Sequence, residues 1–278
     1  MRQAISFHLW NRMNKKKLWR AFRILLGIYV VGGVVLYFLQ DLIIFHPKKL
    51  PLNHSFNFNQ PFKEINISPD GQRNLNIVQF LPEKKAKGIV LYFHGNMTNI
   101  ERYARFALYF TRNDYEVWMV DYPGYGKTTG RRSEKAMYAD ALSFYKLAME
   151  KTTAENIIIY GKSLGTGVAS YLASSKPCKT LVLETPYYSM TSMSQTYVPI
   201  YPARLLRYTF PTNEYLKVAK VPVIIFHGTG DEVIPYTQSL KLKDEFPGIE
   251  LITVPKGKHN NLYQYPAVTQ KLESLLAG

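Results

Sequence analysis

The sequence is poor in cysteine: Cys178 is the single one among 278 residues. A disulfide within the chain is therefore excluded, and the redox compartment is left open. The sequence also lacks a Cys-x-x-Cys pair and any His/Cys cluster with the spacing of a zinc site. We accordingly expect a protein without a metal or a cofactor.

Acidic residues are scarce, with 20 Asp and Glu against 35 Lys and Arg, which gives a net charge of +15. Residues 1–45 carry seven Lys/Arg and one acid, so +6 of this charge lies there. The rest of the chain lacks the packed Lys/Arg runs that mark a nucleic-acid-binding arm. We therefore expect no nucleic-acid partner. The basic residues in the rest of the chain either form a face that binds anionic membrane lipids or are simply solvated.

Charge is absent between residues 24 and 39, where the sequence is almost wholly apolar. With the apolar residues on either side, the run reaches about 20 residues, the length that spans a bilayer. The run contains Gly27, Gly32 and Gly33. Glycine is common in membrane helices but weakens soluble ones. The pattern predicts a transmembrane signal anchor over 21–45 behind a basic leader at 1–20, and the alternative is a buried core helix.

Removal of this run as a signal peptide is a second alternative, but no small-x-small cleavage site follows Leu39. Seven basic residues precede the span, against two, Lys48 and Lys49, just after it. The positive-inside rule then predicts a cytoplasmic N-terminus and a large domain on the far side, periplasmic, extracytoplasmic or luminal. The basic residues before the span are Arg2, Arg12, Lys15, Lys16, Lys17, Arg20 and Arg23.

The body of the chain, residues 62–278, follows a linker at 46–61 that we expect to lie over the membrane surface. The body begins with a predicted antiparallel hairpin, after which strands and helices alternate. Alternation of this kind predicts an α/β fold, a mostly parallel sheet with helices on both faces. The expected strands are 62–68, 75–81, 88–93, 115–120, 156–160, 180–184, 221–226 and 250–254, and the expected helices are 100–110, 134–150, 163–174, 237–246 and 262–276.

One interval, 185–217, has no clear strand and is rich in tyrosine. An irregular stretch of this length inside a compact domain usually has a function, such as an active-site lid. We predict a small cap at about 186–217 that lines an apolar pocket, with Tyr187 and Tyr188 as candidate substrate contacts. The alternative is an insertion that packs its own aromatic side chains.

The most informative motif is Gly161-Lys-Ser163-Leu-Gly165, which fits the G-x-S-x-G nucleophile elbow. An apolar strand precedes it and a helix follows, as the elbow requires. Small residues on either side of the serine let strand and helix pass closely. The serine hydroxyl then stands over a helix N-terminus, where free N–H groups stabilise negative charge.

Polar residues that could complete the site follow other strands. In open α/β sheets, active sites lie beyond the carboxyl ends of the strands. The order Ser163, Asp231, His259 is the one expected for an α/β-hydrolase triad. Histidine takes the serine proton and returns it to the leaving group, and the carboxylate orients the imidazole.

Four other residues compete for these roles. Glu184 also ends a strand, but Asp231 is favoured because its glycine-rich loop lets it turn towards His259. His94 and His227 each precede a glycine, where a histidine often only braces a loop. Asp121 is assigned a structural role.

An oxyanion site needs two backbone N–H donors. One comes from Leu164, after the nucleophile, and the other from the loop that follows the strand at 88–93. Asn96 is the first choice for this second donor and Met97 the alternative.

Together these stretches resemble the α/β-hydrolase superfamily, specifically its Bem46-like branch of α/β-hydrolase-domain proteins. The resemblance implies Ser163 as nucleophile, Asp231 as acid and His259 as base, with esterase, lipase, thioesterase or peptidase-like activity. Glu184-Thr-Pro departs from the branch, which more often has serine or alanine before the proline. The matching stretches are Phe93-His-Gly-Asn, Asp121-Tyr-Pro-Gly-Tyr-Gly, Gly161-Lys-Ser-Leu-Gly-Thr-Gly, His227-Gly-Thr-Gly-Asp-Glu-Val-Ile-Pro and His259-Asn-Asn.

We therefore expect a membrane-anchored serine hydrolase that cleaves an ester or thioester of an apolar acyl substrate through an acyl-enzyme. The expected substrate is a lipid or an acylated protein. Two alternatives stay open: a serine peptidase or amidase of the same fold, and a non-catalytic, membrane-tethered binding protein.

Overall fold

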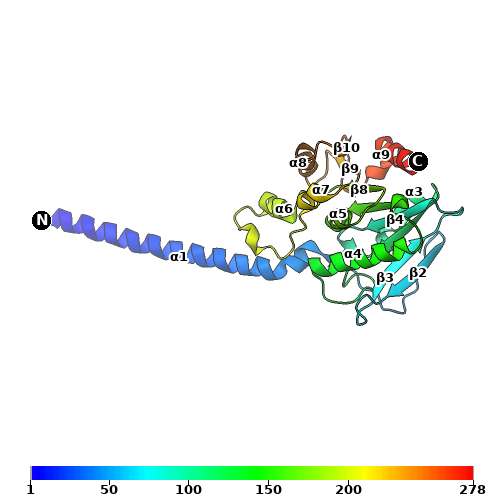
Figure 1. Cartoon of the computed structure of the whole chain (residues 1–278). Coiled ribbons are helices and arrows are strands. Elements are labelled where there is room, and N and C mark those ends of the chain that lie inside the picture. The colour runs from blue at the N-terminus through cyan, green and yellow to red at the C-terminus, as the bar shows by residue number, and fades with distance from the viewer. Residues whose placement is uncertain (1, 278) are drawn as a thin grey trace.

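The computed structural model describes residues 2–277, with side chains from residue 15 onward. Its most prominent feature is helix α1 (Arg2–Ile44), which projects far out of the folded body (Figure 1). The part Lys15–Ile44 is long and apolar enough to cross a membrane, by length and composition, and very little of it is buried.

The body is built on an eight-stranded sheet with the order β10-β9-β8-β7-β4-β6-β3-β2. Strands β2 and β3 pair antiparallel, as do β3 and β6, and every other neighbouring pair is parallel. The expected α/β-hydrolase fold with a mostly parallel sheet is confirmed. The strands are β2 (Phe62–Ile67), β3 (Leu75–Phe80), β4 (Gly88–Phe93), β6 (Tyr115–Val120), β7 (Ile157–Lys162), β8 (Thr180–Glu184), β9 (Val223–Gly228) and β10 (Glu250–Val254).

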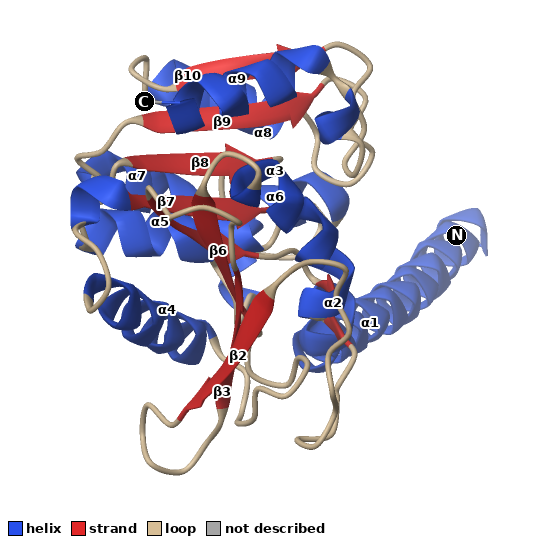
Figure 2. Ribbon diagram, turned by 90° about the vertical axis from the view of Figure 1, so that its right-hand side faces the viewer, coloured by secondary structure: helices blue, strands red, loops and turns tan. Residues whose placement is uncertain are grey.

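Helices cover both faces of this sheet (Figure 2). One core contains side chains of α4 (Glu134–Met149), α5 (Gly165–Ser175) and α8 (Thr237–Glu245). The other core contains side chains of α2 (Ile100–Tyr103), α3 (Leu108–Thr111) and α9 (Pro266–Ala277). Successive residues of a strand point to opposite faces, so β4 alternates between the two cores and is apolar throughout.

The helix expected over 100–110 is broken into pieces. Helix α2 is followed by a 3₁₀ turn, Ala104–Ala107, before α3 begins. Tyr103, Phe106 and Phe110 are nevertheless buried, so their side chains pack in the core although the backbone between them is tightened.

The segment 46–61, expected as a linker, is held against the body. Its strand β1 (His46–Pro47) pairs with β5 (Met97–Thr98), and Lys49 forms a bridge with Gly126. Phe56 is buried beside the second core. Because β5 follows directly on the loop after β4, this pairing places the end of α1 next to that loop.

Between β8 and β9 the chain forms helix α6 (Met190–Tyr197), a 3₁₀ turn at Ala203–Leu205 and helix α7 (Thr212–Val218). The loop between α6 and α7 runs beside the C-terminal part of α1 (Figure 1).

Candidate active site

Ser163 lies in the sharp turn between β7 and α5. Its φ of 51° is in the left-handed region, which a non-glycine residue rarely adopts. The flanking glycines are required by space: a Cβ on Gly165 would lie 2.1 Å from the backbone oxygen of Phe93, and one on Gly161 would lie 2.7 Å from Cβ of Ala169. The turn therefore holds the serine over the start of α5 in a conformation that the packing enforces.

The three side chains singled out from the sequence meet at this turn. His259 Nε2 lies 3.0 Å from Ser163 Oγ, and His259 Nδ1 lies 2.8 Å from Asp231 Oδ2. They come from the ends of three parallel strands, β7, β9 and β10. The separations are those of hydrogen bonds between a nucleophile, a base and an orienting acid.

The Asp231 carboxylate is fully buried and well supplied with donors. Its Oδ1 accepts the backbone N–H groups of Val233 and Ile234 at 2.8 and 2.9 Å. Burial alone would raise the pKa of Asp231, but hydrogen bonds from His227 and His259 outweigh it and hold the pKa well below its ordinary value. The ionised carboxylate accepts a hydrogen bond from the N–H at His259 Nδ1, which leaves Nε2 free to accept the hydroxyl proton of Ser163.

The other histidines brace loops. His227 Nε2 faces the carbonyl of Ile234 at 2.9 Å, and Nδ1 faces the Ser239 hydroxyl at 2.6 Å. Since a carbonyl only accepts, the proton of His227 is on Nε2. His94 is fully buried and lies 3.1 Å from Asp121. Neither histidine is hydrogen-bonded to Ser163.

Glu184, the competing acid, points into the core. It pairs with the buried ammonium of Lys162 and accepts the Tyr160 hydroxyl at 2.8 Å. Its position at the end of β8 brings it close to the turn, but its two carboxylate oxygens face Tyr160 and Lys162.

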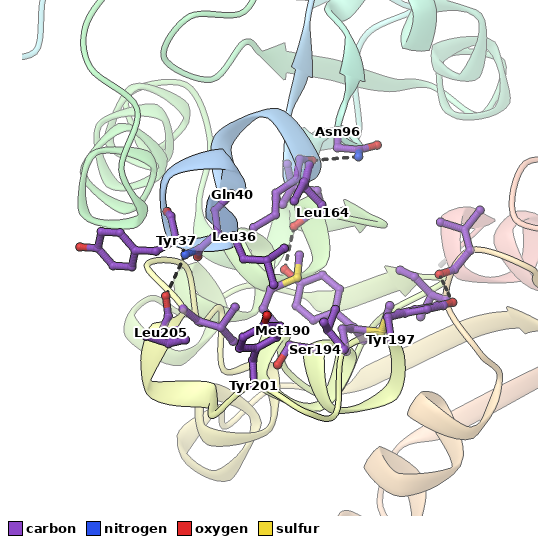
Figure 3. Close-up of a pocket in the computed structure, with 18 of the residues that line it drawn as sticks. Leu36, Tyr37, Gln40, Asn96, Leu164, Met190, Ser194, Tyr197, Tyr201 and Leu205 are labelled. Atoms are coloured by element: carbon purple, nitrogen blue, oxygen red, sulfur yellow. Dashed lines mark hydrogen bonds between the residues drawn. The ribbon is translucent and has the colours of Figure 1, made fainter. Parts of the chain in front are cut away.

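The expected oxyanion donors are distinguished by their hydrogen bonds. Met97 donates its backbone N–H to the hydroxyl of Tyr103 at 3.4 Å, whereas none of the described backbone or side-chain acceptors takes the N–H of Leu164 or Asn96. Leu164 and Asn96 line the cavity over Ser163 (Figure 3), and Met97 is absent from that lining. The Asn96 loop is held in place because its carbonyl accepts the Tyr125 hydroxyl at 2.8 Å.

An apolar cavity of about 320 Å³ opens onto Ser163. Tyr187 lines it and donates its hydroxyl to the Leu164 carbonyl at 3.0 Å. Tyr188, the other expected substrate contact, does not line it, because its hydroxyl turns away to Glu245 on α8 at 2.6 Å. No Asp, Glu, Lys, Arg or His is among the described residues that line the cavity.

No group of three or more His, Cys, Asp and Glu side chains within the described range is arranged to hold a metal ion.

The residues not anticipated are those that α1 contributes to this cavity. Gln40 and four apolar residues of α1 face into the space over Ser163. The sequence offered two signals: the lone amide of Gln40 after a long apolar run, and the adjacent Gly32 and Gly33. The residues are Leu36, Tyr37, Gln40, Ile43 and Ile44.

Sequence comparison finds relatives of this chain among known proteins. Residues 84–218 match the family described as "Serine aminopeptidase, S33". Alpha/beta hydrolase domain-containing protein 17C of Xenopus tropicalis is 30% identical over 68% of this chain, and protein aho-3 of Caenorhabditis elegans is 30% identical over 77% of it. The aligned regions span 61% and 65% of the lengths of these relatives.

Solved structures share the fold at low sequence identity. Est1E from Butyrivibrio proteoclasticus with ferulic acid has a TM-score of 0.64 at 18% identity, covering 76% of this chain and 97% of that one. An esterase of Pyrococcus furiosus has a TM-score of 0.64 at 17% identity, covering 83% of this chain and 98% of its own.

Proposed function

Since the chain belongs to the α/β-hydrolase superfamily, among the α/β-hydrolase domain-containing proteins, we propose that it is a membrane-anchored serine hydrolase. Its substrate is an ester or thioester with an apolar acyl group, carried by a lipid or an acylated protein. The observation that carries the proposal is the linked set Ser163, His259 and Asp231, with separations of 3.0 and 2.8 Å. The apolar cavity over Ser163 supports an acyl group as the part recognised.

The reaction follows from the positions of these groups. Ser163 Oγ attacks the acyl carbonyl while His259 Nε2 takes its proton. The N–H groups of Leu164 and Asn96 stabilise the oxyanion, each worth about 3 kcal/mol of barrier. His259 then protonates the departing alcohol or thiol. A water molecule, deprotonated by the same nitrogen, releases the acid from the acyl-enzyme and regenerates the serine.

Amide cleavage is the second candidate, and the aminopeptidase family match favours it. An aminopeptidase must hold a charged α-amino group, for which a carboxylate is the natural partner. The described lining of the cavity contains no Asp or Glu, so the ester or thioester is preferred.

A fluorophosphonate probe, which reacts with activated serines, tests the proposal. Wild-type protein should be labelled and Ser163→Ala should not. Ser175→Ala, which removes an exposed hydroxyl at the end of α5, is the matched control and should label normally. An unlabelled wild-type protein would instead favour a non-catalytic, membrane-tethered binding protein.

The anchor is proposed to leave the N-terminus in the cytoplasm and the hydrolase domain on the far side of the membrane, because basic residues gather before the span. Protease added outside intact cells or spheroplasts should then digest the domain. Protection that is lost only when the membrane is lysed would reverse this orientation.

A further inference from the structure

The cavity over Ser163 is closed on one side by the membrane helix. Leu36, Tyr37 and Gln40 of α1 line it together with Ser163. Figure 3 shows the end of α1 facing the loop between α6 and α7 across this space. The helix that is long enough to span a bilayer thus continues directly into the wall of the candidate active site. A tether alone would not require this contact.

The contact between α1 and the cap has specific hydrogen bonds. Gln40 is only 6% exposed, and its amide nitrogen donates to the Leu205 carbonyl at 2.8 Å (Figure 3). Its amide oxygen accepts the backbone N–H of Arg207 at 2.7 Å. Because both ends of a buried amide are satisfied by the cap, separating the helix from the cap would leave unpaired polar groups.

The contact extends well along the helix. The rings of Tyr29 and Tyr201 stack with their centroids 4.9 Å apart, and Tyr29 donates its hydroxyl to the Ile200 carbonyl at 3.0 Å. A Cβ on Gly32 would lie 2.2 Å from the Tyr201 hydroxyl, so glycine lets the Tyr201 side chain lie directly against the helix. From Tyr29 to Gln40 the helix rises about 16 Å, at about 1.5 Å per residue.

All but the last residue of this stretch belong to the uncharged run 24–39. If α1 spans the bilayer, the cap segment 197–206 therefore lies at the same depth in the membrane as this apolar part of the helix. It also exposes large apolar side chains, since Ile200 is 67% and Tyr197 is 55% exposed. Apolar surface of this kind beside a spanning helix is stabilised by contact with lipid.

A second hollow of about 330 Å³ lies between α1 and this segment. Among the described residues that line it, the charged one is Arg204, whose side chain is long enough to reach a membrane–water interface. The two hollows share four lining residues and therefore adjoin, and together they extend along the helix from Ser163 back to Tyr29. The shared residues are Tyr37, Tyr201, Pro202 and Leu205.

We propose that this space is a groove for an acyl chain that remains in the membrane. The chain enters sideways between α1 and the cap segment 197–206, and its carbonyl reaches Ser163 at the inner end. The inference rests on the proposed function and narrows its substrate class to acyl groups held in the same bilayer as α1, as opposed to acyl groups taken from water.

The test uses the full chain carrying Ser163→Ala in phosphatidylcholine vesicles that contain a phosphatidylcholine with a photoreactive diazirine in its acyl chain. Irradiation should label the α6 peptide with Met190 and Met193, which line the inner cavity. Leu36→Trp fills the groove and should reduce this labelling at least about fivefold. Val35→Trp is the matched control, since Val35 is 46% exposed and lines neither hollow, and labelling should be unchanged.

Labelling confined to the exposed face of α1, or an equal loss in both tryptophan variants, would overturn the groove. So would labelling of α6 by a water-soluble diazirine fatty acid but not by the lipid. Hydrolysis by the wild-type chain is measured separately in the same vesicles. Labelling of α6 without hydrolysis would support the groove but contradict the proposed hydrolase activity. Failure of the groove and failure of the proposed function can therefore be told apart.

Discussion

The ammonium group of Lys162 donates to the backbone carbonyl of His259 at 3.2 Å. Lys162 immediately precedes Ser163, is 2% exposed, and is paired with Glu184 at the end of β8. A single buried ion pair therefore connects the turn that carries the serine to the loop that carries the histidine. Lys162 acts as a positioning residue, since the hydroxyl and imidazole groups themselves do not touch it in any described hydrogen bond.

The first prediction concerns this ion pair. Glu184→Ala leaves the Lys162 ammonium buried without its counter-charge, which should lower the free energy of unfolding by about 3–5 kcal/mol. Urea unfolding followed by circular dichroism measures the loss. The double variant Lys162→Met/Glu184→Gln removes the charge as well and should recover part of the stability. Equal losses in the single and double variants would show that the buried charge is not the cause.

The second prediction is a pH dependence of stability. The pKa of Asp231 in the folded protein lies below its ordinary value of 3.8. Between those two pKa values the unfolded chain binds more protons than the folded one, so stability falls as the pH drops from about 4 towards the folded pKa. Asp231→Asn should lack this part of the decline. Urea midpoints at several pH values between about 3 and 6 compare the two proteins, and parallel curves would contradict the assignment.

Much of this site is predictable because the residues follow strands. Ser163, Asp231 and His259 each lie just beyond the end of a parallel strand, and strand ends of one sheet meet at one edge. The glycine-rich loop that carries Asp231 then favoured it over Glu184, which also lies between Ser163 and His259 in the sequence. The candidate oxyanion loop follows a strand for the same reason. The sequence put Asn96 before Met97, and the hydrogen bond that occupies the Met97 N–H supports that preference.

Other features depend on contacts that the sequence pattern does not specify. An apolar run such as 24–39 indicates an apolar environment, and lipid or a packed cap satisfies it equally. The contact of Gln40 with Leu205 joins residues 165 positions apart, and nothing local selects one partner over another. Lys162 occupies a variable position of the elbow motif, so the motif carries no information about its burial or its partner.

The third prediction tests the close packing at the elbow. Gly165→Ala places a Cβ 2.1 Å from the backbone oxygen of Phe93, which cannot move aside as a side chain could. The variant should lose about 1–3 kcal/mol of stability, and it should also slow fluorophosphonate labelling because α5 and β4 are pushed apart. Gly248→Ala is the matched control, since a Cβ there meets nothing within 4 Å. A Gly165→Ala protein as stable and reactive as the control would refute this role.

The last prediction concerns the oxyanion loop. The side chain of Asn96 donates to the Ile44 carbonyl at 2.9 Å, at the C-terminal end of α1. Asn96→Ala keeps the backbone N–H but removes this anchor, so the donor is held less accurately where negative charge develops. Accurate placement matters most in the transition state, and we expect kcat to fall by up to about 100-fold while KM changes little.

Asn113→Ala is the control for this change. The Asn113 amide likewise donates to a backbone carbonyl, that of Tyr109 at 2.9 Å, but it does so on the surface and away from the cavity. Kinetics on one acyl ester should show a loss of kcat for Asn96→Ala only. A rise in KM at constant kcat would instead place Asn96 in ground-state binding of the substrate. If the two variants behave alike, the end of α1 does not position the oxyanion donor, and the helix contributes to the site only through the wall of the cavity.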